Sequence, residues 1–246
     1  MKDRDFTLTS TVDLLAPGVN MPRLGFGIYR VQPSETFDVV LATLGAGYRH
    51  LDSAQLYNNE AELGQAIRKS GLARKDVFLT TKIRYPGMNK AKTWKKVLDS
   101  VKKVSGAEVA SGKKRKRADD GVPAEAQADG GAEYVDLFLV HTPYGGPNAK
   151  KGRREMWLAL ERAFEEGRAL AIGVSNYKVE HLEEMREYAK VWPPHVNQIQ
   201  KRWVPLPKSE GPERMKANTE VFDFVIEDGD MEMLDGLDGK KLGYFE

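Results

Sequence analysis

The chain has 246 residues, a net charge of +2 at pH 7 and no cysteine. This charge gives no overall electrostatic reason to expect binding to nucleic acid or to an anionic membrane. The lack of cysteine excludes disulfide scaffolds, zinc sites with thiolate ligands and cysteine nucleophiles. No apolar run approaches the length of about 18 residues that spans a bilayer, and the N-terminal segment lacks the apolar core of a signal peptide. We therefore expect a soluble cytoplasmic protein without nucleic-acid or membrane partners.

Short apolar runs alternate with amphipathic segments along most of the chain. The runs predict six strands, over Leu24–Tyr29, His50–Ala54, Val77–Ile83, Tyr134–Val140, Ala171–Val174 and Val196–Ile199. Helical spacing of apolar residues predicts helices over Glu60–Lys69, Glu155–Glu166 and Lys178–Lys190. An early hairpin is also predicted, which pairs Phe6–Thr9 with Val12–Leu15. This alternation of strands and helices indicates an α/β fold with a parallel sheet.

One segment, residues 105–132, interrupts the alternation. It has no apolar periodicity and is rich in glycine, alanine and charge, so it predicts a disordered insertion within a single domain that spans residues 1–246. The basic run Lys113–Arg117 resembles a nuclear-localisation patch. Five acidic residues in the segment balance its five basic ones, which favours a solvated loop over a nuclear-localisation signal.

Polar residues lie at the ends of five of the predicted strands: Asp52 followed by Tyr57, Lys82, His141, Ser175-Asn176, and Asn197-Gln198. Parallel sheets and barrels place their chemistry at the carboxyl ends of strands, so these side chains are expected to lie together. Asp52 and Lys82 are 30 positions apart; Lys82 and His141 are 59 apart, or 31 without the 28-residue insertion. A repeat of about 30 residues, one strand plus one helix, predicts a TIM-type (β/α)8 barrel.

A dinucleotide site of the Rossmann type is poorly supported by the sequence. Gly25-Phe26-Gly27 offers two of the three glycines of that fingerprint, and no helix follows immediately. We interpret these two glycines as a tight backbone bend.

Several segments in combination resemble the aldo-keto reductase family. They are Met21–Gly27, Gly47–Ala54 with Tyr57–Glu60, Asp136–His141, Ile172–Tyr177, Val196–Ile199 and Pro205–Ser209. The resemblance covers the chain from about Phe6 to Leu237, apart from the insertion. It implies an oxidoreductase that reduces an aldehyde or ketone to an alcohol with NADPH, without a metal or a flavin.

The resemblance implies roles for four catalytic residues. Tyr57 would be the general acid that protonates the carbonyl oxygen while hydride arrives at the carbon. An unperturbed phenol has a pKa of about 10, and the Lys82 ammonium is expected to lower the pKa of Tyr57 by favouring its phenolate. Asp52 would hold that ammonium by a charge-assisted hydrogen bond. His141 would orient the carbonyl and donate to the developing oxyanion.

The same resemblance implies two groups of cofactor-binding residues and a substrate pocket. Ser175, Asn176 and Gln198 would hold the nicotinamide amide. Lys208, Ser209, Arg214 and Asn218 would surround the adenosine 2′-phosphate and adenine, and the cationic pair among them favours NADP over NAD. Tyr29, His141 and Thr142 would line the substrate pocket. Thr142 stands where many members have an aromatic residue, which predicts a more open pocket wall.

The sequence departs from the family after the sixth predicted strand. Lys208 follows Gln198 by only 10 positions, where the sixth helix, the seventh strand and most of the seventh helix would be. The aromatic residue that stacks on the nicotinamide and the loop that clasps the pyrophosphate would be lost with them. A parallel crossover needs a dozen or more residues, and Gln200–Trp203 gives four. An incomplete barrel is therefore predicted, whose last segment cannot be a direct parallel neighbour of the sixth strand in native register. It must shift, pair differently or lie outside the sheet.

Two functions of different classes remain open from the sequence. The complete set of catalytic residues favours a working NADP-dependent reductase of a small carbonyl substrate. The lost cofactor clasp favours a weakly active or non-catalytic relative that acts as a binding or regulatory module. A nuclear partner function has only the run Lys113–Arg117 in its favour. The identity of the substrate and the oligomeric state are not encoded in any motif of the chain.

Overall fold

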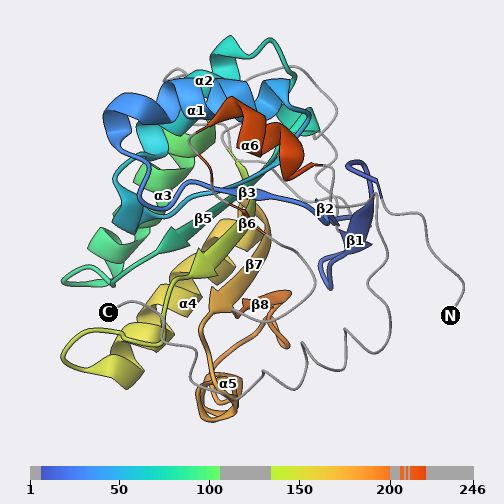
Figure 1. Ribbon diagram of the computed structural model, residues 1–246. Coiled ribbons are helices and arrows are strands. Elements are labelled where there is room, and N and C mark those ends of the chain that lie inside the picture. The colour runs from blue at the N-terminus through green and yellow to red at the C-terminus, as the bar shows by residue number, and fades with distance from the viewer. Residues whose placement is uncertain (1–6, 106–133, 200–205, 208, 210, 220–246) are drawn as a thin grey trace, which may run out of the picture.

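A computed structural model describes residues 7–105, 134–199, 206, 207, 209 and 211–219 (Figure 1). Its centre is a parallel sheet in the order β3-β4-β5-β6-β7-β8, curled into a half-barrel. The strands are β3 (Phe26–Gly27), β4 (His50–Asp52), β5 (Phe78–Ile83), β6 (Val135–Val140), β7 (Ala169–Ser175) and β8 (Val196–Gln198). All six predicted strands are confirmed, and the order along the chain is also the order in the sheet. This is the architecture of an incomplete (β/α)8 barrel.

A helix follows each strand from β3 to β7, as parallel connections require, and a sixth helix follows β8. They are α1 (Pro33–Gly45), α2 (Glu60–Lys69), α3 (Lys90–Ser105), α4 (Ala149–Glu165), α5 (Val179–Arg186) and α6 (Pro212–Ala217). Figure 1 shows α1 to α4 arranged along the outer side of the sheet. Every residue of β5 and β6 is buried, because these central strands are covered by helices on one face and by the barrel interior on the other.

Helix ends differ from the sequence prediction for identifiable reasons. The prediction over Glu60–Lys69 matches α2 at both ends. Helix α4 begins earlier than predicted, because the Asn148 side chain accepts a hydrogen bond from the Lys151 backbone N–H at 3.2 Å and caps the helix there. Helix α5 ends earlier than predicted, at Arg186. The buried Glu161 carboxylate accepts from the backbone N–H groups of Lys190 and Val191 at 2.6 and 2.9 Å, which holds that backbone outside the helix.

The predicted N-terminal hairpin is wrong in its pairing. Strand β1 (Thr11–Asp13) pairs antiparallel with β2 (Asn20–Pro22), and the stretch 7–9 forms a turn instead of a strand. The positive φ of Gly18, +71°, allows the chain to reverse between the two strands. The apolar alternation of 6–15 therefore identified one strand correctly and assigned it the wrong partner.

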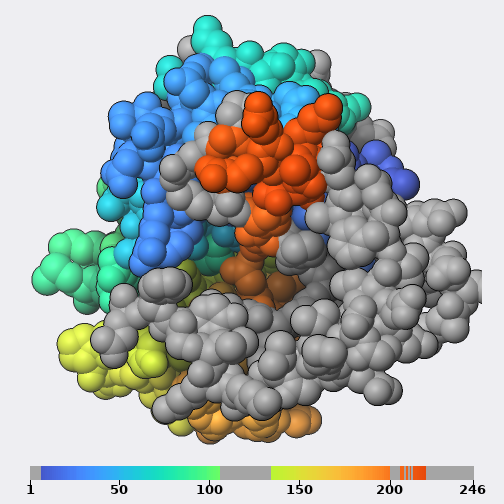
Figure 2. All heavy atoms as spheres, in the orientation of Figure 1, coloured from blue at the N-terminus to red at the C-terminus, as the bar shows by residue number. Residues whose placement is uncertain are grey.

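The last described segment lies beside the first strand of the sheet and not beside the sixth. The Gly27 N–H donates to the Pro207 carbonyl oxygen at 3.2 Å, so this segment joins the edge opposite β8. Helix α6 then packs on α1 (Figure 2). The hydroxyl of Tyr48, three residues after α1, donates to the Met215 carbonyl oxygen at 3.4 Å. Residues 199–205 are all that connect β8 to Leu206, which agrees with the prediction that a direct parallel crossover is impossible.

Gly25 and Gly27 do not form the tight bend that the sequence suggested. Gly27 lies within β3, and neither glycine has a positive φ. Their lack of a side chain permits a close approach instead. A Cβ atom on Gly25 would lie 2.5 Å from the Leu206 Cδ2 atom and 2.6 Å from the His50 Nδ1 atom. These glycines therefore let the last segment close against the first strand.

Two sequence predictions concern regions beyond the described part. Apart from Ser105, which ends α3, the expected disordered insertion lies outside the described residues, and so does the basic run Lys113–Arg117. Among the residues that the structure describes, no helix combines the length and the apolarity needed to cross a membrane.

Candidate active site

The centre of the candidate site is a buried ion pair between neighbouring strands. Asp52 ends β4 and Lys82 lies near the end of β5, and the two strands are paired in parallel. The Lys82 Nζ atom donates to Asp52 Oδ1 at 2.5 Å and to the Ser53 carbonyl oxygen at 3.0 Å. The two residues are only 4% and 1% exposed. The predicted charge-assisted bond is present, and the barrel interior shields it from water.

Tyr57 and His141 stand next to this ion pair. Tyr57 ends a short 3-10 helix, Gln55–Tyr57, which follows β4 and is called the Tyr57 turn below. Its ring centroid lies 5.7 Å from the His141 ring, and the Lys82 Nζ atom lies 5.4 Å from the Tyr57 centroid. His141 directly follows β6. The structure therefore brings all four predicted catalytic residues together at the carboxyl ends of three neighbouring strands.

The electrostatics of Tyr57 differ from the sequence prediction. Burial, together with the nearby Asp52 carboxylate, raises the pKa of Tyr57 above that of a free phenol. The sequence predicts a lowered pKa, and this prediction is wrong in direction. The Lys82 ammonium is paired with Asp52, so its attraction for a phenolate is outweighed by burial and by the Asp52 carboxylate. Tyr57 consequently carries its proton throughout the neutral pH range.

His141 is neutral at physiological pH. Burial lowers its pKa to about 4, and the Lys82 charge acts in the same direction. The Asn176 side-chain amide donates to the His141 carbonyl oxygen at 3.1 Å and links the end of β6 to the end of β7. A neutral imidazole can donate one N–H without bringing a positive charge into the site.

The three residues predicted to hold a nicotinamide amide form a single hydrogen-bonded cluster at the ends of β7 and β8. Ser175 Oγ and the Asn176 N–H both donate to the Gln198 carbonyl oxygen at 3.0 Å. Asn176 adopts a left-handed conformation with φ of 60°, which turns the chain into this position. The Gln198 amide donates from Nε2 to Asp52 Oδ2 at 3.0 Å. Sequence reasoning missed this last bond, because the two residues are far apart in the chain.

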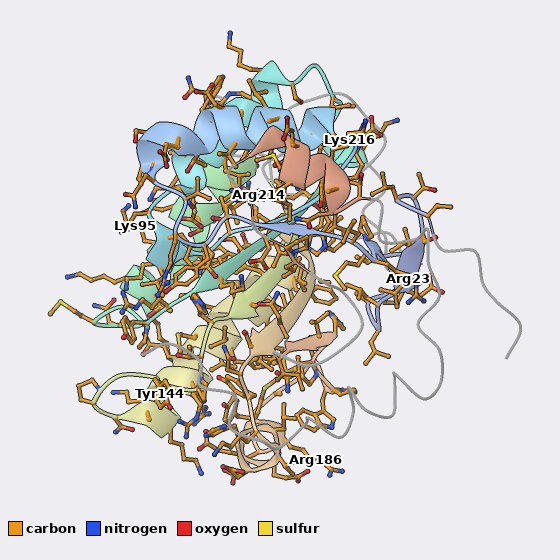
Figure 3. All side chains as sticks on the ribbon, viewed as in Figure 1. Arg23, Lys95, Tyr144, Arg186, Arg214 and Lys216 are labelled. Carbon is orange, nitrogen blue, oxygen red and sulfur yellow. The ribbon has the colours of Figure 1, made fainter. Side chains whose placement is uncertain are left out.

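The residues predicted to surround the 2′-phosphate lie at the opposite edge of the sheet. The Arg214 Nε atom donates to Ser209 Oγ at 3.2 Å, and Asn218 follows α6 directly. Arg214 is exposed and Ser209 is buried. Figure 3 labels Arg214 and Lys216 on α6. Lys208, the other predicted cation of this group, lies outside the described residues. Two parts of the predicted cofactor site therefore flank the open side of the half-barrel.

Two of the three predicted substrate residues, Tyr29 and His141, have rings beside the ring of Tyr57. The Tyr29 ring lies 5.0 Å from the Tyr57 ring and is 49% exposed, and the Arg30 guanidinium stacks over it at 5.3 Å. Thr142, directly after His141, is half-buried. Within the described ranges no three His, Cys, Asp or Glu side chains gather in a way that could hold a metal ion. The site thus consists of the rings of Tyr29, Tyr57 and His141 beside a buried ion pair.

A parallel half-barrel with polar and ionisable side chains at the carboxyl ends of its strands has the site location of barrel enzymes. The sequence profile of the Aldo/keto reductase family matches residues 23–202 of this chain. The chain therefore belongs to this family. The resemblance noted from the sequence is therefore confirmed.

Individual relatives are similar along most of the chain. It is 32% identical to an uncharacterised oxidoreductase of Schizosaccharomyces pombe, covering 90% of this chain and 91% of that protein. It is 37% identical to the 9,11-endoperoxide prostaglandin H2 reductase of Trypanosoma cruzi, covering 74% of this chain but 53% of that protein. A crystal structure of an aldo/keto reductase from Brucella melitensis superposes with a TM-score of 0.73 at 27% identity, covering 93% of this chain and 99% of that one. These relatives place the chain among oxidoreductases.

Proposed function

We propose that this chain is an NADPH-dependent reductase of small aldehydes or ketones. The observation that carries the proposal is the buried Asp52–Lys82 pair beside Tyr57 and His141, in a chain of the aldo/keto reductase family. Relatives that are named for reductions, such as the glyoxal reductase of Bacillus subtilis at 33% identity over 74% of this chain and 55% of that protein, support a small carbonyl substrate.

The chemistry of the four residues follows from their charge states. Tyr57 keeps its proton at neutral pH because its pKa is raised, so its hydroxyl acts as the proton donor to the carbonyl oxygen. Neutral His141 donates an N–H to the same oxygen and stabilises the negative charge that develops there. The Lys82 ammonium supplies a fixed positive charge behind Tyr57 and stabilises the tyrosinate left after proton transfer. Asp52 fixes the ammonium in place.

The residues present fit the two ends of a nicotinamide dinucleotide. The side-chain oxygens of Asn176 and Gln198 can accept from the nicotinamide amide, since the bonds described above use their N–H groups. Arg214, held by Ser209, offers a planar cation for a 2′-phosphate. When bound, the dinucleotide supplies the hydride that reduces the carbonyl carbon. The sequence between Gln198 and Lys208 lacks the clasp for the pyrophosphate, so we expect weak binding.

The short connection after β8 also favours the alternative function. A chain that cannot clasp its cofactor could retain the half-barrel only as a non-catalytic binding or regulatory module. NADPH titration followed by tryptophan fluorescence separates the two. A dissociation constant well above the micromolar range fits the open groove, ordinary micromolar affinity contradicts the expected weakness, and no binding by the folded chain supports the module.

The catalytic assignment is tested by Tyr57→Phe. The variant should lose carbonyl reduction while its dissociation constant for NADPH stays within about twofold, because only the proton donor is removed. Tyr188→Phe is the matched control, since it removes a phenol that packs under Arg154 of α4, away from the site. Equal reduction rates in Tyr57→Phe and the parent chain would eliminate Tyr57 as the donor.

A further inference from the structure

The Tyr57 turn is anchored to the neighbouring helix and strand by a side chain that no sequence motif singled out. Gln55, the first residue of the turn, donates from Nε2 to Ser100 Oγ at 3.0 Å and to the Lys96 carbonyl oxygen at 3.2 Å, both on α3. Its Oε1 atom accepts from the Arg84 backbone N–H at 3.4 Å, directly after β5. One amide therefore joins the turn that carries Tyr57 to the end of the strand that carries Lys82.

A second set of hydrogen bonds continues this connection into the protein interior. Ser100 Oγ donates to Glu60 Oε2 at 3.1 Å, and Thr81 Oγ1 donates to Glu60 Oε1 at 2.6 Å. Glu60 begins α2 three residues after Tyr57, and Thr81 directly precedes Lys82 on β5. Glu60, Thr81 and Ser100 are at most 4% exposed. We call Gln55, Glu60, Thr81 and Ser100 the buried bracket.

The other flank of the turn is held independently. Asn59 donates from Nδ2 to the carbonyl oxygens of Ile28 and Val31 at 3.0 and 3.1 Å, and its Oδ1 atom accepts from Ser53 Oγ at 3.1 Å. This fixes the turn against the segment after β3. The buried bracket is thus what sets its position relative to β5 and α3, the elements beside Lys82.

Packing alone does not explain a carboxylate in this bracket. Burial raises the pKa of Glu60, which shows that the interior disfavours its charged form in spite of two hydroxyl donors. An apolar side chain of similar size would fill the same space without this cost. Polar groups that lower stability but fix geometry are typical of residues that support a functional site.

We propose that the buried bracket sets the distance between Tyr57 and Lys82, with Gln55 and Ser100 as positioning residues in carbonyl reduction. The inference rests on the function proposed above. It requires that weakening the bracket moves the phenol away from its productive geometry and leaves the cofactor residues on β7 and β8 untouched.

The kinetic test compares Gln55→Ala, Ser100→Ala and the double variant with Val101→Ala. Val101 is the buried neighbour of Ser100 on α3, so its truncation destabilises the same helix without touching the bracket. A displacement of about 1 Å can cost up to 100-fold in rate, and we expect kcat to fall about tenfold in each bracket variant at an unchanged dissociation constant for NADPH. The loss in the double variant should be smaller than the product of the two single losses, because both changes remove the same Gln55–Ser100 bond. Val101→Ala should lower the unfolding temperature with kcat unchanged.

A spectroscopic test does not depend on turnover. In a chain labelled with 3-fluorotyrosine, the fluorine resonance of Tyr57 can be assigned with Tyr57→Phe among the nine tyrosines. We expect this resonance to shift or broaden in Gln55→Ala and Ser100→Ala and to stay unchanged in Val101→Ala. An unchanged resonance in both bracket variants, or an unchanged kcat, overturns the positioning role. A parent chain that reduces no carbonyl compound refutes the proposed function, and the fluorine resonance then decides by itself whether the bracket positions Tyr57.

Discussion

Replacing Asp52 with asparagine tests whether the centre of the site is as dry as the structure indicates. The substitution keeps the shape of the side chain and removes the charge that neutralises Lys82, whose Nζ atom lies 2.5 Å away. Asparagine retains an oxygen toward Lys82, but it turns an N–H group toward the Gln198 Nε2 donor that now contacts Asp52 Oδ2. The variant therefore contains a buried ammonium without a counter-charge and two opposed donors.

The magnitude follows from the burial of the pair. Removing one partner of a buried ion pair costs about 3–5 kcal/mol, because the remaining charge stays out of water. Lys82 keeps its bond to the Ser53 carbonyl oxygen and can still donate to the asparagine oxygen. We therefore expect a loss at the lower end of this range, about 3 kcal/mol. This corresponds to a loss of roughly 100-fold in the ratio of folded to unfolded chain.

The assay is urea unfolding followed by tryptophan fluorescence, with Asp99→Asn as the matched control. The Lys95–Asp99 pair has the same 2.5 Å separation, but its side chains are 72% and 45% exposed. An exposed pair on one helix contributes about 0.5 kcal/mol or less. Asp52→Asn combined with Lys82→Met should recover most of the lost stability, since no unpaired charge remains. Equal losses for Asp52→Asn and Asp99→Asn would show that burial does not strengthen the dependence of Lys82 on its partner.

Three further predictions follow from other parts of the structure. Burial lowers the pKa of His50 from 6.5 to about 4, so the unfolded chain takes up a proton below about pH 6.5 that the folded chain refuses until about pH 4. The free energy of unfolding should therefore fall as the pH drops through this window, by up to about 3 kcal/mol from His50, and His50→Gln should remove this part of the decline measured by urea titration at each pH, while His141 keeps its own part. Gly173→Ala should cost about 2 kcal/mol in the same assay, because the new Cβ would lie 2.4 Å from the Val196 carbonyl oxygen; a loss below about 0.5 kcal/mol would contradict this. Arg214→Ala should weaken NADPH binding at least tenfold and leave NADH binding unchanged, and an equal effect on both would remove Arg214 from the phosphate site.

The sequence alone determined the six strands of the main sheet and which residues lie together in the candidate site. The apolar runs of β4 to β7 are local patterns, and a residue such as Lys82 at the end of a buried strand has only one edge of a parallel sheet on which to lie. For the same reason the spacing of Asp52, Lys82 and His141 was enough to bring them together. The missing length after Gln198 was equally visible, because a crossover has a minimum number of residues.

The tertiary structure decided the partners and the charge states. Strand β1 pairs with Asn20–Pro22, and Gly25 leaves space for Leu206. Both contacts depend on how separate segments meet, so local patterns do not reveal them. The bond from Gln198 to Asp52 joins residues that are 146 positions apart, and the buried bracket links four elements, the Tyr57 turn, α2, β5 and α3. The pKa of Tyr57 rises and does not fall, since desolvation and a neighbouring carboxylate outweigh an ammonium that is already paired. Burial and neighbouring charges set the pKa of such a group, and neither can be read from local residue patterns.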